Sequence, residues 1–253
     1  MKLRVLDLFS GIGGFSLGLE RTGGFETVAF CEIEPFQRKV LAKHWPEVPQ
    51  YEDVRTLTAD RLAADGIAVD VITGGFPCQD ISVAGRQAGI GQGTRSGLWS
   101  ECLRLVSELR PEYAIFENVT NLLSGPSERP GGWFSRVLSD LASIGYDAEW
   151  ENIPASALGA SHRRSRVWII AYANSKPMAG SSKKEIQGFS SLQRLIHSRG
   201  VTPFDRLSSI RESGLCRNHN GIPNQMDRVK ACGNAVVPQI PELIGRAILE
   251  AKA

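Results

Sequence analysis

A cysteine in a rigid turn is the first residue of this chain that could do chemistry. Cys78 follows Gly-Gly-Phe-Pro at 74–77, shortly after a largely apolar run at 69–72. A strand that ends in such a turn can hold a thiol at the carboxyl edge of a parallel sheet, where ligands bind. Thiolates are strong nucleophiles, although few cysteines ionise at neutral pH without help. A small buried thiol at a turn fits the same residues, so Cys78 alone leaves both interpretations open.

A carboxylate and two arginines, like Cys78, stand next to apolar runs that are predicted strands. Glu117 comes directly after another apolar run, so we expect its carboxylate at the same carboxyl edge of the sheet. Arg164 and Arg166 lead into a further apolar run, and alternate residues of a strand point to the same side. These three side chains therefore join Cys78 as candidate site residues.

A glycine-rich turn near the N-terminus predicts a nucleotide site. Residues 7–15 read Asp-Leu-Phe-Ser-Gly-Ile-Gly-Gly-Phe, and their glycines permit close backbone approach and tight strand–helix packing. Glu32 ends the next predicted strand, where an acidic residue can accept both ribose hydroxyls. Asp53 could accept from an adenine amino group, or it could equally be a capping or loop carboxylate. Ser16 replaces the last glycine of the dinucleotide pattern, which argues against a nicotinamide enzyme.

The elements that would position these residues alternate between strand and helix patterns. Helical spacing of apolar residues follows several of the apolar runs, and a last helix is predicted over 238–247, entered through prolines. This alternation predicts an α/β fold of three layers with a mostly parallel sheet. Between 175 and about 226 the periodicity is lost. The predicted strands are 3–9, 27–31, 69–73, 113–116, 146–153 and 167–172.

Composition excludes several classes of protein. A chain of 253 residues with 42% hydrophobic content can bury a full core and a small appendage. Its five cysteines are an odd number without Cys-x-x-Cys spacing, so neither a disulfide scaffold nor a metal site is expected. The N-terminus lacks a secretory pattern, and no apolar run reaches membrane-spanning length. We therefore expect a cytoplasmic protein with reduced thiols and no membrane partner.

The charge is unevenly distributed along the chain. Residues 174–229 contain nine Lys/Arg and four Asp/Glu, whereas the rest of the chain contains 20 and 23. Such an asymmetry indicates a segment that faces a polyanion, although a solvated loop would show the same charges.

Five short motifs follow one another in an order that carries a resemblance. They are the Phe-Ser-Gly-Ile-Gly-Gly turn at 9–14, Pro77-Cys78-Gln79, Glu117-Asn118-Val119, the arginine pair, and Gly233-Asn234. Together they resemble the DNA (cytosine-5-)methyltransferase family. Residues 221–228 resemble phage and prophage members, and His162 stands where the family usually has Gln. We interpret His162 as a structural residue.

The resemblance implies a Rossmann-like fold that uses S-adenosylmethionine (SAM), with a small irregular recognition segment. The catalytic, cofactor-binding domain would span 1–173, a short target-recognition segment 174–229, and a motif with a returning helix 230–253. Because that recognition segment is short for the family, its sequence selectivity could be poor or could be supplied by a partner.

The resemblance also implies the reaction and its residues. Cys78 would attack carbon 6 of a flipped-out cytosine, so that carbon 5 accepts a methyl group from SAM. A protonated Glu117 would donate to ring nitrogen 3, Arg166 would hold oxygen 2, and Arg164 would brace the site. The implied cofactor contacts are Phe9, Gly11, Gly13, Glu32, Ile33, Asp53, Val54, Gly75, Pro77, Leu98, Asn234 and Ala235. The implied DNA contacts are Gln79, Ser82, Arg86 and Arg95, the last two within a glycine-rich segment, 85–97, suited to close as a lid.

Two other functions compete with this interpretation. An RNA cytosine methyltransferase would share the fold, but the Cys-Phe-Thr element of family members that act on tRNA is missing. A non-catalytic DNA-binding relic of the family would need none of Cys78, Glu117 and Arg166, and all three are present. The partners implied by the resemblance are duplex DNA and, optionally, a cognate restriction endonuclease, with the protein acting as a monomer.

Overall fold

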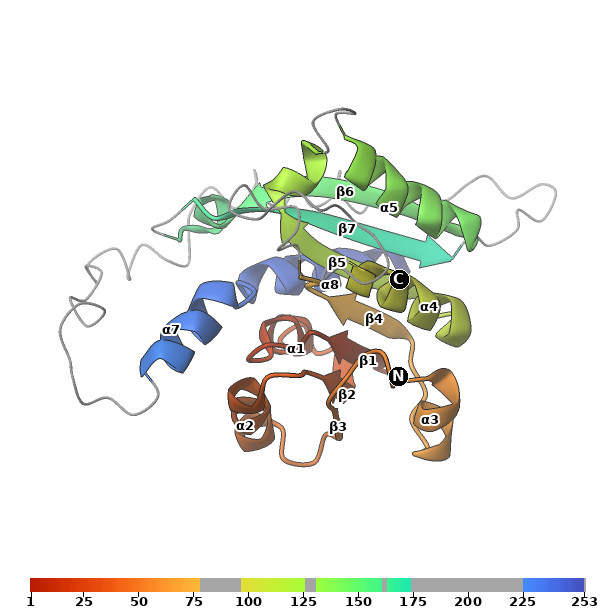
Figure 1. Cartoon of the computed structure of the whole chain (residues 1–253), viewed down its shortest axis with the longest axis vertical. Helices are drawn as coiled ribbons and strands as arrows, with labels where there is room; N and C mark the ends of the chain where they lie inside the picture. The colour runs from red at the N-terminus through yellow and green to blue at the C-terminus, as the bar shows by residue number, and fades with distance from the viewer. Residues whose placement is uncertain (78–96, 126–130, 161–162, 174–224, 253) are drawn as a thin grey trace.

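The fold is built on a sheet of seven strands in the order β3-β2-β1-β4-β5-β7-β6. In the computed structural model, the described residues are 1–77, 97–125, 131–160, 163–173 and 225–252. β7 runs antiparallel to both β5 and β6, whereas the other neighbours pair in parallel, and the arrowheads of β4 and β7 point in opposite directions in Figure 1. The strands are β1 Leu3–Leu8, β2 Phe25–Cys31, β3 Gln50–Tyr51, β4 Val71–Gly74, β5 Tyr113–Val119, β6 Tyr146–Pro154 and β7 Ser165–Ala173.

Helices cover both faces of this sheet, which gives three layers. One apolar cluster joins α3, α4 and α5 to one face, and a second joins α1 and α8 to the other. The mostly parallel α/β fold expected from the sequence is confirmed. The helices are α1 Gly14–Glu20, α2 Pro35–His44, α3 Ala59–Ala64, α4 Leu98–Leu109, α5 Gly132–Ser143, α7 Gln225–Asn234 and α8 Gln239–Lys252, with 3-10 turns η2 Thr120–Leu123 and η3 Ala155–Leu158.

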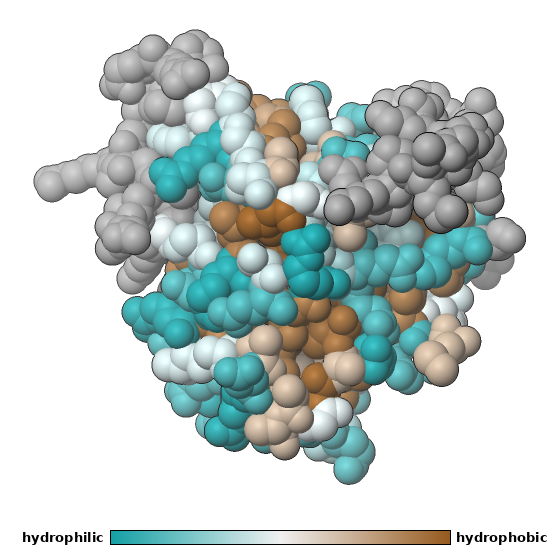
Figure 2. Space-filling view, turned by 90° about the vertical axis from the view of Figure 1, so that its right-hand side faces the viewer, coloured by the Kyte–Doolittle hydropathy of each residue, from teal (hydrophilic) through white to brown (hydrophobic). Residues whose placement is uncertain are grey.

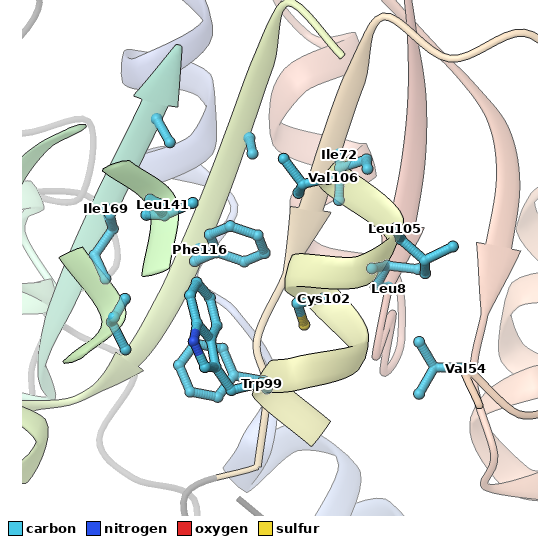
Figure 3. Packing of buried hydrophobic residues seen from close by; sticks show 14 of the residues in the cluster. Leu8, Val54, Ile72, Trp99, Cys102, Leu105, Val106, Phe116, Leu141 and Ile169 are labelled. Atoms are coloured by element: carbon cyan, nitrogen blue, oxygen red, sulfur yellow. The ribbon is translucent and has the colours of Figure 1, made fainter. Parts of the chain in front are cut away.

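The core packs tightly beneath α4. Trp99 and Cys102 point from this helix toward the sheet, where Phe116 and Ile72 lie (Figure 3). The rings of Trp99 and Phe116 meet edge to face at 5.2 Å, and both are completely buried or nearly so. This packing fixes β4 and β5 side by side and so fixes the carboxyl ends of these strands, where the candidate residues lie.

The strand order reverses between β1 and β4: β2 and β3 lie on one side of β1, and β5, β7 and β6 lie on the other side of β4. In open α/β sheets, ligands bind beyond the carboxyl ends of the strands at such a switch point. Figure 2 shows the opposite side of the molecule, where β4 begins; it is the right-hand side of Figure 1. There, hydrophobic residues reach the surface among hydrophilic ones. None of the helices in the described parts of the chain has the length and hydrophobicity that a membrane span requires.

Candidate active site

A cavity of about 1090 Å³ lies at the carboxyl ends of β1, β2, β4 and β5. Glu117, Arg164 and Arg166 all line it, so the structure brings together the three candidate residues outside the cysteine turn. Ten of the twelve predicted cofactor residues line the same cavity; Gly13 and Ala235 do not. The ten are Phe9, Gly11, Glu32, Ile33, Asp53, Val54, Gly75, Pro77, Leu98 and Asn234.

The turn after β1 holds the carboxylate of Glu32 in place. The backbone N–H of Gly11 donates to one carboxylate oxygen at 2.7 Å, and the N–H of Glu34 donates to the other at 2.9 Å. Phe9 and Gly11 have φ of 51° and 56°, a region that favours glycine, so the non-glycine Phe9 is strained there. The Glu32 residue is only 8% exposed, so this carboxylate has a fixed position on the cavity wall.

The other glycines of the turn serve packing within the protein. A Cβ on Gly13 would lie 2.6 Å from the ring of Trp45, and one on Gly14 would lie 2.5 Å from the carbonyl oxygen of Val236. Both glycines therefore let neighbouring segments approach α1 closely. This packing neither supports nor contradicts the predicted contact of Gly13 with a cofactor, but it is enough to explain why the residue is glycine.

Asp53 faces the cavity with its carboxylate already engaged. Arg55 donates to it from Nε at 2.9 Å and 3.0 Å and from Nη2 at 2.6 Å. The hydrogen bonds and charge of Arg55 hold the pKa of Asp53 below its usual value. Asp53 is therefore ionised and can act as an acceptor.

The other end of the cavity contains a buried ion pair. Arg166 Nε lies 2.7 Å from Glu117 Oε1, and only 13% of the Glu117 side chain is exposed. Burial raises the pKa of Glu117, while the charges of Arg166 and Arg164 oppose that rise. A Cβ on Gly75 would lie 3.4 Å from Glu117 Oε2, so the backbone directly after β4 also lies close to this carboxyl.

The two arginines reach the cavity in different ways. Arg166 belongs to β7, but Arg164 precedes the strand, which begins at Ser165, and has a positive φ of 26°. We expected both arginines to point to the same side of one strand, but Arg164 lies outside β7, so strand geometry does not set its direction. Its guanidinium donates to the carbonyl oxygens of Gly233 and Ala235, the latter at 3.0 Å. Arg164 thus joins the start of β7 to the last turn of α7 and to the residue that follows this helix.

Several candidate residues lie outside the described residues: Cys78, Gln79, Ser82, Arg86, Arg95 and His162, together with 174–224 of the recognition segment. The chain on either side of the cysteine turn is described, and Pro77 and Gly97 both line the cavity. Asn118 Nδ2 donates to the carbonyl oxygen of Phe76 at 3.2 Å, which anchors the backbone two residues before Cys78.

The sequence analysis gave no individual role to Asn118 and Asp7, two of the buried polar residues; Asp7 lies beneath the glycine turn. Asp7 accepts from Thr73 Oγ1 and Ser16 Oγ, each at 2.8 Å, and burial raises its pKa to about 7. An acid within the apolar run Val-Leu-Asp-Leu-Phe was the available signal. In the described part of the chain, no three His, Cys, Asp or Glu residues are grouped so that they could hold a metal ion.

Solved structures with the same fold include several methyltransferases. A prophage-encoded protein of E. coli described as a DNA modification methyltransferase matches with a TM-score of 0.57 and 30% identity, over 68% of this chain and 47% of that one. DNMT2 of Spodoptera frugiperda matches with a TM-score of 0.56 over 73% of this chain and 54% of that one, and at 20% identity it shows the fold alone.

Comparison of sequences leads to one family. Type II methyltransferase M.Sau3AI of Staphylococcus aureus is 37% identical over 183 residues, which cover 68% of this chain and 43% of the relative. Type II methyltransferase M2.BsuMI of Bacillus subtilis is 35% identical over 173 residues, 67% of this chain and 42% of the relative. This chain thus spans less than half the length of these relatives. The family model of the C-5 cytosine-specific DNA methylases matches residues 3–206. The chain belongs to the C-5 cytosine-specific DNA methylase family.

Proposed function

We propose that this chain transfers a methyl group from SAM to carbon 5 of cytosine in duplex DNA, with Cys78 as the nucleophile. One observation carries the proposal: a single cavity contains both the glycine turn with Glu32 and the Glu117–Arg166 pair. Pro77, which directly precedes Cys78, lines the same cavity. A cofactor and a base bound there would lie next to each other.

The residues present fit SAM. A Cβ on Gly11 would meet no atom within 4 Å, so this position borders open space at the switch point of the sheet. The Glu32 carboxylate would hold the ribose hydroxyls, and Asp53 would accept from the adenine amino group. Phe9, Ile33 and Leu98 give the cavity apolar surface for the adenine. The contacts of Gly13 and Ala235 with the cofactor stay predictions.

The three described thiols are poor competitors for the role of Cys78, and one of them, Cys232, is exposed and does not line the cavity. Cys31 lines the cavity but is 2% exposed, and burial raises its pKa to about 12. Burial also raises the pKa of Cys102. Cys31 and Cys102 are therefore protonated at neutral pH, and the thiol form is a weak nucleophile. This supports Cys78, by its place in the sequence, as the reacting cysteine.

In the proposed reaction, the Cys78 thiolate forms a bond to carbon 6 of the cytosine, and the electrons of the 5,6 double bond become available at carbon 5. When bound, SAM supplies the methyl group that carbon 5 accepts. A base then removes the proton from carbon 5, the sulfur–carbon 6 bond breaks, and the thiolate leaves. Each bond made to sulfur is thus broken again, and the free enzyme is restored.

Glu117 and Arg166 would assist this addition through the ring. Negative charge moves toward nitrogen 3 and oxygen 2 as the thiolate adds, so a protonated Glu117 would donate to nitrogen 3 and Arg166 to oxygen 2. Burial raises the pKa of Glu117, which favours the protonated form that this role requires. Arg164, bound to the carbonyls of Gly233 and Ala235, would brace the arrangement.

The DNA side of the proposal rests on the family alone. Gln79, Ser82, Arg86 and Arg95 would contact the duplex around the flipped base, and 174–229 would read its sequence. A cognate restriction endonuclease, a monomeric state and a cytoplasmic location stay predictions.

Transfer of labelled methyl groups tests the proposal. The protein is incubated with labelled SAM and duplex DNA, and methylated cytosines are mapped by bisulfite sequencing. Cys78→Ser should abolish transfer while SAM binding persists, and Cys31→Ser is the matched control that should retain transfer. Label in RNA but not in DNA would favour the RNA methyltransferase. SAM binding without transfer to either nucleic acid would favour the non-catalytic relic.

A further inference from the structure

A row of three side chains crosses the sheet beside the proposed base site. Trp168 on β7 is directly opposite Glu117 on β5 and, on its other side, directly opposite Glu151 on β6. Residues directly opposite each other in an antiparallel pair project from the same face, with their Cβ atoms about 4.5–5.5 Å apart. Trp168 therefore stands between the inner carboxyl of Glu117 and that of Glu151 on the outermost strand.

The surroundings of Trp168 are apolar. The Trp168 residue is only 1% exposed, and its ring meets that of Phe15 on α1 edge to face at 5.4 Å. Its indole N–H is buried without a hydrogen-bond partner among the described residues. An unpaired buried donor is unfavourable, so the size and apolar surface of the ring, and not its polar atom, are what this position uses.

We propose that Trp168 is a positioning residue for Glu117: its ring closes the site toward the edge of the sheet and keeps water away from the carboxyl. The inference rests on the proposed function, because a dry carboxyl matters most if Glu117 must donate a proton. It adds a residue outside the motifs that carry the family resemblance.

Charged groups approach Glu117 from several elements. Arg166 on β7 contacts it directly, Arg164 acts on it from just before that strand, and Glu151 faces it across Trp168. Gly75, directly after β4, and Phe15 of α1, on the far side of Trp168, are both uncharged. The two arginines favour the ionised carboxyl, so exclusion of water has to counteract them if the proton is to stay. The indole ring is the large apolar group in this row.

The test is a direct titration of Glu117 in the full chain, by carbon-13 NMR with labelled glutamate and Glu117→Gln to assign the signal. Trp168→Ala should admit water and lower the pKa of Glu117 by about one unit, a tenfold shift in its ionisation. Trp168→Phe should restore most of the wild-type value. If the alanine variant does not fold, Trp168→Leu, which opens less space, should show a smaller shift in the same direction.

Trp150→Ala is the control. Trp150 lies on β6 opposite Ile169, so it projects from the other face of the sheet, where it packs on Phe134. Its removal should leave the titration of Glu117 unchanged. An unchanged Glu117 pKa in a folded Trp168→Ala or Trp168→Leu variant would overturn the inference, as would an equal shift in Trp150→Ala. The titration needs no methyl transfer, so wild-type protein that fails to methylate DNA would refute the proposed function without touching this result.

Discussion

Two carboxylates at opposite ends of the cavity are held by different means. Glu32 accepts from the backbone N–H groups of Gly11, in the turn after β1, and of Glu34, the N-cap residue of α2. Glu117 is held by the side chain of Arg166, and burial raises its pKa. Backbone donors fix an acceptor for hydroxyl groups, whereas a dry site with a movable partner suits a group that has to give up a proton. Under the proposed function, this difference explains how one sheet edge would both bind the cofactor and act on the base.

The largest effect is expected at the Glu117 end. Glu117→Gln removes the proposed proton donor, and we expect methyl transfer to slow by about 10²–10⁴-fold while SAM affinity stays constant. If Glu117 acts in its protonated form, its raised pKa sets the high-pH limb of the wild-type profile, where activity should fall as pH rises through that pKa, whereas the need for a Cys78 thiolate lowers the rate at low pH. The variant should lack the high-pH limb of the pH–rate profile.

Glu112→Gln is the matched control for that variant. Glu112 directly precedes β5 at its other end, is exposed and pairs with Lys252. Its variant should keep the wild-type rate and profile. A Glu117→Gln enzyme with normal activity would show that the two ends of the cavity do not differ in the way described.

A smaller effect is expected at the Glu32 end, and of a different kind. Glu32→Gln places an amide N–H₂ where a backbone donor now binds, so SAM affinity should fall by roughly 10–100-fold, as expected for the loss of hydrogen bonds to a charged acceptor. The rate at saturating SAM should change little. Calorimetry measures the first quantity and steady-state kinetics the second. Glu26→Gln, on the exposed part of the same strand, should change neither. If Glu32→Gln kept its SAM affinity but had a slower maximal rate, Glu32 would act in the reaction and not in cofactor binding, contrary to the account.

The smallest effect on activity is expected from Asp7, a third carboxyl, which lies beneath the turn. Its pKa is about 7 in the folded protein, against an ordinary value of 3.8. The folded state therefore keeps a proton that the unfolded state has lost, so the stabilisation is full below about pH 4 and is lost as pH rises through about 7. Asp7→Asn should flatten this dependence of the Tm. A wild-type Tm that does not decline between pH 5 and 8 would contradict the assignment.

The sequence predicted the parts of the fold that depend on apolar runs. Strands such as Leu3–Leu8 and Tyr113–Val119 are buried on both faces, and such strands appear as nearly continuous hydrophobic segments. Helix α7 was missed because few apolar residues recur in Gln225–Asn234, and β3 because it has two residues. Helix α8 extends to Lys252, five residues beyond the prediction.

The sequence predicted those parts of the candidate site that lie at the ends of strands, because neighbouring strand ends meet at one edge of the sheet. This holds for Glu32, Glu117 and Arg166, which line one cavity. Contacts between distant segments were not predictable. Arg164 binds carbonyl groups some 70 residues further along the chain, and the glycine pattern gave no sign that Gly13 makes room for Trp45. Such contacts depend on how the helices pack onto the sheet.

Covalent trapping on duplex DNA that contains 5-fluorocytosine is the most direct test of a shared cavity for cofactor and base. The fluorine blocks proton removal at carbon 5, so the adduct should persist only when SAM is also present. After tryptic digestion, mass spectrometry should place the DNA adduct on the peptide of residues 62–86, whose single cysteine is Cys78. An adduct on the peptide that contains Cys31, or methylation of ordinary DNA without any trapped species, would contradict the account.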